Sequence, residues 1–153
     1  MTALEIGAAV QAGRASARDI TEAALEAIRE NNQALNAFTL VADTSARAFA
    51  SEIDSRIAKG LKVGPLAGVP FAAKELFDIQ DEITMAGAKL RGSEPMATRD
   101  ASSIARMKAA GAVCLGRLNM DEFAYGFATV NAHFGTTHNP YDVDRLAGGS
   151  SGG

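Results

Sequence analysis

Lys74 is the first residue of this sequence whose type and position indicate chemistry. It follows a short apolar segment, residues 69–73, which is bounded by turn residues and therefore predicts a buried strand. A lysine at the end of such a strand can point into a cleft, where desolvation and neighbouring positive charge favour the neutral amine, a base. The alternative is a lysine that extends its amine to solvent along an apolar stem.

A second candidate is the pair Ser150 and Ser151, which lies within the glycine-rich segment 148–153. Glycines on both sides of the pair permit unusual backbone angles and close approach of a substrate. They also leave backbone N–H groups free to bind an anion, so a phosphate cradle and a flexible linker are alternatives. The P-loop pattern ends in Gly-Lys-Ser/Thr, which this segment lacks.

The remaining titratable candidates are weaker. His133 and His138 are the only histidines, and a Ser–His–Asp triad would need one of them as its base. Both lie in a polar segment without a cluster of ligand residues, so ordinary loop histidines are favoured and no metal site is predicted. Asp121 and Glu122 are either a carboxylate pair or, as we favour, acids that complement the N-terminus of a short helix beginning near Asn119.

Composition excludes several classes of protein. The 153 residues suffice for about one domain, and 47% hydrophobic with 22% charged residues is typical of a globular chain. A net charge of −3 without a basic cluster argues against direct binding of nucleic acid. The single cysteine excludes an internal disulfide. No signal sequence and no apolar stretch of about 18 residues is present, so we expect a cytoplasmic protein without a membrane span.

The elements that must position these residues fall into two regions. Apolar residues at helical spacing predict helices over residues 2–12, from Ser16 onward and from residues 43–44 to 59, with a short strand at 38–41. We therefore expect a helical N-terminal arm over residues 1–60.

Residues 61–153 predict the start of an α/β core. Strand 69–73 is followed by a helix over residues 101–110 and a second buried strand over 112–115, an alternation typical of an α/β layer. A short helix is expected over 119–125, and mostly loop after it. Open glycine-rich turns usually connect two packed elements, so the sequence is expected to be a fragment.

Taken together, these segments resemble the amidase signature family. The resemblance implies an α/β/α core with a mixed sheet, of which this chain would hold the first part after the helical arm. So many ordered matches make the resemblance specific. The stretches that carry it are residues 64–70, 74, 76–78, 98–101, 109–113, 119–124, 139–140 and 145–153.

The resemblance also implies roles for individual residues. The family hydrolyses amides with a Ser–cisSer–Lys triad, in which Lys74 would be the base, Ser150 the middle serine that relays the proton, and Ser151 its supporting neighbour. The nucleophile belongs to a later Asp-x-Gly-Gly-Ser motif whose backbone N–H groups form the oxyanion hole. Because that motif is absent here, residues 1–153 alone are expected to be inactive. The family needs no metal and no organic cofactor.

Substrate and partners are less narrowly implied. Residues 119–127 are similar to small-amide amidases related to biuret and carboxybiuret hydrolases, and Tyr125 favours that group. The amidase-type subunit of the glutamyl-tRNA(Gln) or aspartyl-tRNA(Asn) amidotransferase shares the Asn-Met-Asp-Glu-Phe core, so glutamine-dependent transamidation is the alternative, and an inert fragment a third. A small linear amide is the expected substrate, with a homodimer or a small partner subunit left open.

By the same resemblance, the loop 124–131 should line the acyl pocket. Ala124, Tyr125, Asn131 and, from the glycine-rich segment, Gly149 are the predicted substrate-binding residues. One departure from the family pattern lies next to the lysine: Glu75 stands where relatives usually carry Asp or Asn. Its longer side chain is expected to alter the hydrogen bonds that hold the lysine loop.

Overall fold

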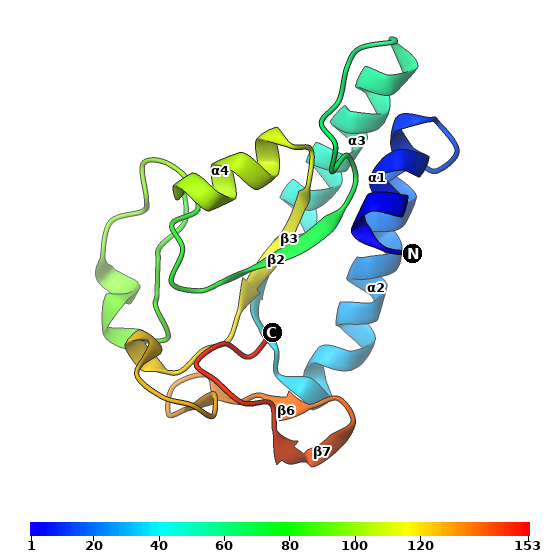
Figure 1. Cartoon of the computed structure of the whole chain (residues 1–153). Helices are drawn as coiled ribbons and strands as arrows, with labels where there is room; N and C mark the ends of the chain where they lie inside the picture. Colours follow the sequence, from blue (N-terminus) through cyan, green and yellow to red (C-terminus); the bar gives the residue numbers. More distant parts are fainter. The chain divides into compact units, whose positions relative to one another are not determined.

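The computed structural model describes residues 1–153, which form two compact units, each assembled from three segments of the chain (Figure 1). The first unit comprises Met1–Ala27, Ala42–Phe71 and Ala105–Leu115. The second unit comprises Ile28–Val41, Ala72–Ile104 and Gly116–Gly153. Both units draw on sequence from either side of residue 60, and the division into an arm and a core at that residue stays a prediction.

Three helices begin in the N-terminal region, and all three confirm the predictions. They are α1 (Ala3–Gln11), α2 (Ala17–Leu35) and α3 (Asp43–Ala58). Helix α1 starts with a capping box, in which the Thr2 hydroxyl accepts a hydrogen bond from the Glu5 backbone N–H and the Glu5 carboxylate accepts one from the Thr2 backbone.

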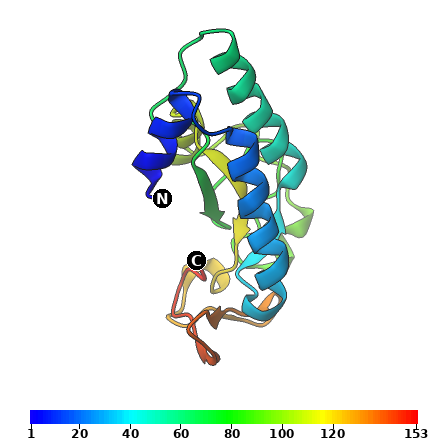
Figure 2. The same ribbon diagram turned by 90° about the vertical axis from the view of Figure 1, so that its right-hand side faces the viewer.

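The first turns of α2 lie beside α3 (Figure 2) and are held there by Asp54. Its carboxylate accepts hydrogen bonds from the Ala17 backbone N–H at 2.7 Å and from the Ser16 hydroxyl at 2.7 Å. The same hydroxyl accepts the Asp19 backbone N–H at 3.1 Å, as the N-cap prediction required. Otherwise unpaired N–H groups at the start of α2 are thereby satisfied.

The core of the first unit is apolar. Each large aliphatic side chain buried there contributes roughly 1.5–3 kcal/mol relative to leaving it exposed. Small residues at the other buried positions let the helices approach closely. The buried helical residues of this unit include Val10, Ala17, Leu25, Ala46, Ala50 and Ile53.

The principal sheet has three strands in the order β1-β3-β2: β1 (Phe38–Val41), β3 (Val113–Leu118) and β2 (Pro70–Lys74). Strand β1 is antiparallel to β3. Strand β2 runs parallel to β3, since the Val113 N–H donates to the Val69 carbonyl at 2.8 Å and the Glu75 N–H to the Leu118 carbonyl at 3.2 Å. The sheet is therefore mixed, as expected, and α4 (Ser102–Ala109) lies in the connection between its parallel strands.

Strand β3 continues three residues beyond its expected end at Leu115, because Arg117 is buried although it is charged. Its side chain is only 2% exposed, and its guanidinium pairs with Glu82 at 2.5 Å and donates to the Phe77 carbonyl at 3.1 Å. A charged residue normally signals the end of a buried strand, so the apolar pattern predicts too short a segment.

The C-terminal region differs most from expectation. The predicted helix over 119–125 is only a three-residue 3-10 helix, η2 (Glu122–Ala124), and a second one, η1 (Lys89–Ser93), was not predicted. Residues 126–153, expected to be mostly loop, contain short antiparallel pairs. Most of these strands are too short to show an alternating pattern. They are β4 (Val130–Asn131) with β5 (Gly135–Thr136), and β6 (His138–Asn139) with β7 (Asp142–Leu146).

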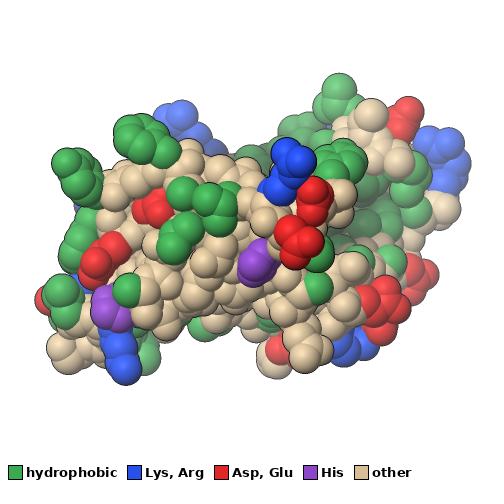
Figure 3. Space-filling view, turned by 90° about the horizontal axis from the view of Figure 1, so that it is seen from below, with side chains coloured by type: hydrophobic (Ala, Val, Ile, Leu, Met, Phe, Trp, Pro, Cys, Tyr) green, Lys and Arg blue, Asp and Glu red, His purple; other side chains and the backbone are tan.

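The surface carries isolated apolar side chains. Figure 3 shows them in separate groups on one face, among acidic, basic and uncharged polar atoms. Tyr125, Phe127 and Tyr141 are each more than 90% exposed. None of the helices combines the length and the apolar character that crossing a membrane requires.

Candidate functional site

The structure brings Lys74 and Ser150 together, although 76 positions separate them in sequence. The Lys74 Nζ lies 2.6 Å from the Ser150 Oγ and donates a hydrogen bond to it. Lys74 is the last residue of β2, Ser150 lies in the glycine-rich segment, and both are half-buried. The peptide bond between Gly149 and Ser150 is cis.

This pair has the geometry that proton transfer needs. An amine and a hydroxyl at hydrogen-bonding distance can exchange a proton directly, and a hydroxyl so placed can pass the proton of a third group on to the amine. The alternative of a lysine extended into solvent does not describe Lys74, because its amine is engaged by Ser150. The catalytic roles of the two residues remain predictions.

Buried hydrogen bonds fix the chain on either side of Lys74. Glu75 is 2% exposed, and its carboxylate accepts the Thr39 hydroxyl at 2.6 Å and the Gly87 backbone N–H at 3.1 Å. Glu75 thus ties the end of β2 to strand β1 and to residue 87. Both bonds run to an ionised acceptor, a stronger class than bonds between neutral groups.

The segment that carries Ser150 is held as a short strand. The Asp121 N–H donates to the Ser150 carbonyl at 3.1 Å, and the Gly152 N–H donates to the Asn119 carbonyl at 2.9 Å. Between them Ser151 forms an antiparallel bridge with Met120. Ser151 is therefore placed by its backbone next to Ser150, and the supporting role of its hydroxyl remains a prediction.

The predicted pocket residues differ in accessibility. Ala124, the last residue of η2, is half-buried and has a left-handed backbone with φ of 59°. Tyr125 is 95% exposed, and Gly149 is exposed beside Ser150. Substrate contacts by these three residues remain predictions.

Asn131, by contrast, is buried, and its amide is fully engaged within the chain. Its Nδ2 donates to the carbonyls of Gly87 at 2.7 Å and Met120 at 2.8 Å. Its Oδ1 accepts the backbone N–H groups of His133 at 2.8 Å and Phe134 at 3.1 Å. Both donors and both acceptor positions of the amide are thus used. The arrangement describes a connector of three segments, and a contact of Asn131 with substrate remains a prediction.

The histidines have local partners. The His138 Nδ1 lies 2.7 Å from the Val143 carbonyl, and the His133 Nε2 lies 3.5 Å from the Glu122 carboxylate. No group of three His, Cys, Asp or Glu side chains has the arrangement of a metal site.

Comparison with known proteins identifies the family. The profile of the family described as Amidase matches residues 19–153. The chain belongs to the amidase signature family. It is 52% identical over its whole length to AtzE, a 1-carboxybiuret hydrolase subunit of Pseudomonas sp. strain ADP, and 45% identical to the corresponding glutamyl-tRNA(Gln) amidotransferase subunit of Thermobifida fusca.

The fold agrees with that membership. A solved chain from a vestigial protein complex related to an s-triazine catabolic enzyme superposes with a TM-score of 0.96 at 52% identity, over 99% of this chain. This chain spans 34% of AtzE, 30% of the amidotransferase protein of Thermobifida fusca and 33% of the solved chain. It therefore covers about a third of the length of these amidase signature proteins.

Sequence reasoning missed the role of Asp121 in this amidase signature segment. We expected its acid to complement a helix N-terminus, but it makes no side-chain cap bond to η2. Instead its carboxylate accepts the backbone N–H groups of Ala128 at 3.2 Å and Val130 at 3.1 Å. No periodic pattern marks such a contact, because its partners are main-chain groups whose placement depends on the fold.

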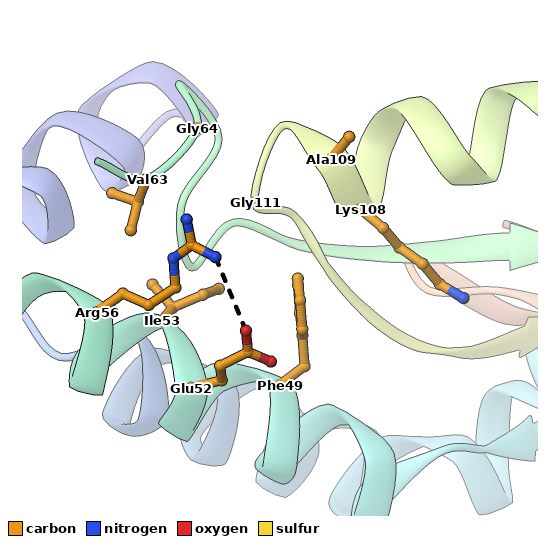
Figure 4. Close-up of a pocket in the computed structure, with 9 residues that line it drawn as sticks. All are labelled: Phe49, Glu52, Ile53, Arg56, Val63, Gly64, Lys108, Ala109 and Gly111. Atoms are coloured by element: carbon orange, nitrogen blue, oxygen red, sulfur yellow. Dashed lines mark ion pairs between the residues drawn. The ribbon is translucent and has the colours of Figure 1, made fainter. Parts of the chain in front are cut away.

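A cavity of about 170 Å³ in the first unit is a separate feature (Figure 4). It is lined by apolar side chains of α3, including Phe49 and Ile53, and by Arg56, whose Nη1 lies 3.9 Å from the Glu52 carboxylate. None of the residues predicted to act on or bind a substrate lines it.

Proposed function

We propose that the full-length protein is an amidase that hydrolyses a carbon–nitrogen bond of a small linear amide through a Ser–Ser–Lys acyl-enzyme mechanism. The observation that carries the proposal is the 2.6 Å contact between the Lys74 amine and the Ser150 hydroxyl. Membership of the amidase signature family and the 52% identity to a carboxybiuret hydrolase subunit support it.

The chemistry divides into two acyl transfers. A serine from the expected Asp-x-Gly-Gly-Ser motif, beyond residue 153, attacks the amide carbonyl and gives its proton to Ser150, which passes its own proton to Lys74. The relay then returns a proton to the nitrogen of the leaving amine as the carbon–nitrogen bond breaks. Water attacks the resulting ester by the same route and releases the acid and the free serine. The mechanism uses no metal and no organic cofactor.

The remaining site assignments follow from this proposal. Ser151 supports the relay, while Ala124, Tyr125, Asn131 and Gly149 border the bound acyl group. Residues 1–153 alone show no turnover, because the nucleophile and the oxyanion hole lie outside them. The protein is cytoplasmic and works as a homodimer or with a small partner subunit.

Two substitutions in the full-length protein test the proposal. Lys74→Ala and Ser150→Ala are each expected to lower kcat for ammonia release from small amides by about a thousandfold or more, because each breaks the relay. The urea unfolding midpoint should stay close to that of the unmodified protein. Lys89→Ala, an exposed lysine on η1, serves as the matched control and should retain activity. Near-normal turnover in both site variants would refute the mechanism.

A second candidate function is favoured by the 45% identity to a glutamyl-tRNA(Gln) amidotransferase protein. The full-length protein would then release ammonia from glutamine for transfer within a complex. Co-purification with two companion subunits and a strict requirement for glutamine would support this function. Hydrolysis of small amides by the isolated chain, without glutamine, would exclude it.

A further inference from the structure

The carboxylate of Asp121 joins separate segments around Ser150. The side chain is buried, with 6% of its residue exposed. Its two oxygens each accept one backbone N–H, Oδ1 from Val130 and Oδ2 from Ala128, while the Asp121 backbone N–H donates to the Ser150 carbonyl at 3.1 Å. A single residue therefore contacts the loop over the predicted acyl pocket and the serine that Lys74 engages.

Two glycines allow the carboxylate to approach the backbone this closely. A Cβ added to Gly149, the residue before Ser150, would lie 2.5 Å from the Asp121 Oδ2, and one added to Gly126 would overlap the Asp121 carboxyl group. Real Cβ atoms do not approach other atoms so closely, so the carboxylate packs directly against both glycine backbones. The position of the Gly149–Ser150 peptide is thereby coupled to that of the Asp121 side chain.

We infer that Asp121 is a positioning residue that holds the Ser150 hydroxyl within reach of the Lys74 amine. The inference rests on the proposed function. An ionised carboxylate offers an acceptor to each of the two loop N–H groups, and charge-assisted bonds of this kind are strong. An asparagine would present an NH₂ group to one of them, which breaks one bond and sets two donors against each other.

The consequence for catalysis is geometric. Displacing the loop or the Gly149 backbone moves Ser150, and a hydrogen bond weakens steeply once its angle and distance depart from the favoured range. Misplacement of a reacting group by about 1 Å is enough to lower a rate by about a hundredfold. A residue that acts only through the fold would lower stability and leave the turnover of the folded enzyme unchanged.

The test is Asp121→Asn in the full-length protein, with the exposed Asp144→Asn on β7 as the matched control. We expect kcat to fall by about 10- to 100-fold, with KM within about twofold of the unmodified value. The pH dependence of kcat, which reports the relay, should change in the same variant, and the control should match the unmodified protein in all three measurements.

Each other outcome decides the matter. Unchanged kcat and pH dependence in folded Asp121→Asn overturn the positioning role, even if the unfolding midpoint falls. If the variant does not accumulate as folded protein, Asp121→Ser, which leaves room for a water in place of the carboxylate, is measured in the same way. Lys74→Ala is assayed alongside: its activity would refute the proposed function, whereas inactive Lys74→Ala beside fully active Asp121→Asn would refute only the inference.

Discussion

In the first unit, the buried side chains are almost all apolar, whereas the second unit buries charged and amide groups. Thr21 is the only buried polar residue of the first unit. The second unit buries, among others, Glu75, Arg117, Asn119 and Asp121. Buried polar groups are costly unless hydrogen-bonded, so the second unit depends on precise hydrogen bonding where the first depends on packing.

The backbone shows the same division. Every non-glycine residue with a positive φ lies in the second unit. Such conformations cost of order 1–3 kcal/mol each and persist where the surrounding contacts over-determine them. The unit that contains Lys74 and Ser150 thus sacrifices stability to fix polar groups in place. These residues are Asn36, Asp81, Ala86, Phe123, Ala124 and Thr129.

The largest expected effect tests the apolar half of this comparison. Ile53→Ala on α3 removes a side chain that is 3% exposed and should lower the free energy of unfolding by about 2–5 kcal/mol. Urea unfolding of the full-length protein measures it. The kcat of the protein that remains folded should not change, because the Lys74–Ser150 contact lies in the other unit. A stability loss below about 1 kcal/mol would contradict an apolar core.

Asn131→Ala tests the polar half. It leaves the carbonyls of Gly87 and Met120 and two backbone N–H groups without partners, which should cost about 1–3 kcal/mol in the free energy of unfolding. Gln33→Ala, which removes an exposed amide on α2, is the control and should be nearly neutral. A rise in KM without loss of stability would instead assign Asn131 to substrate binding.

Gly149→Ala asks how tightly the second unit is packed at its site. The added Cβ would lie 2.5 Å from the Ala128 backbone nitrogen, so the segment must shift, at a cost of about 1–2 kcal/mol in stability. Because Ser150 is the next residue, kcat should fall as well. Gly92→Ala, where the nearest atom is 3.5 Å away, is the control and should leave both quantities unchanged. Equal behaviour of the two variants would show that residue 149 tolerates a side chain.

The same division explains what the sequence could predict. Helices α1 to α3 and strand β1 are predicted within one or two residues, because an apolar face repeats regularly along each of them. Lys74 and Ser150 are singled out by residue type and by the glycines and apolar residues around them. The distance between them is not predictable from spacing alone, because it depends on how β2 and the C-terminal segment fold.

What could not be predicted lies where polar groups are buried. Arg117 interrupts an apolar run but stays within β3, because Glu82 and a backbone carbonyl compensate its burial. The acid of Asp121 binds loop N–H groups rather than a helix end, and Asn131 uses all of its amide on backbone partners. These partners are main-chain atoms, which every sequence supplies, so residue identity does not reveal them.

The smallest effect concerns electrostatics at the surface of the first unit. Hydrogen bonds from Arg47, then from Arg18, lower the pKa of Glu22 from 4.5 to about 2. Because the folded-state pKa lies below the unfolded one, the stabilisation is complete above about pH 4.5 and is lost as the pH falls toward 2. Glu22→Gln should therefore lower the urea midpoint at neutral pH by a small amount, and the difference should shrink below pH 4.5.

Added salt should reduce the difference at neutral pH, since these side chains are partly exposed to solvent. Glu30→Gln, an exposed acid on the same helix, is the control and should show no comparable dependence on pH. A midpoint difference for Glu22→Gln that grew toward low pH would have the wrong sign for an ion pair that stabilises the fold. It would assign the contact between α2 and α3 to apolar packing and Asp54 alone, and the contrast between the two units would then be sharper still.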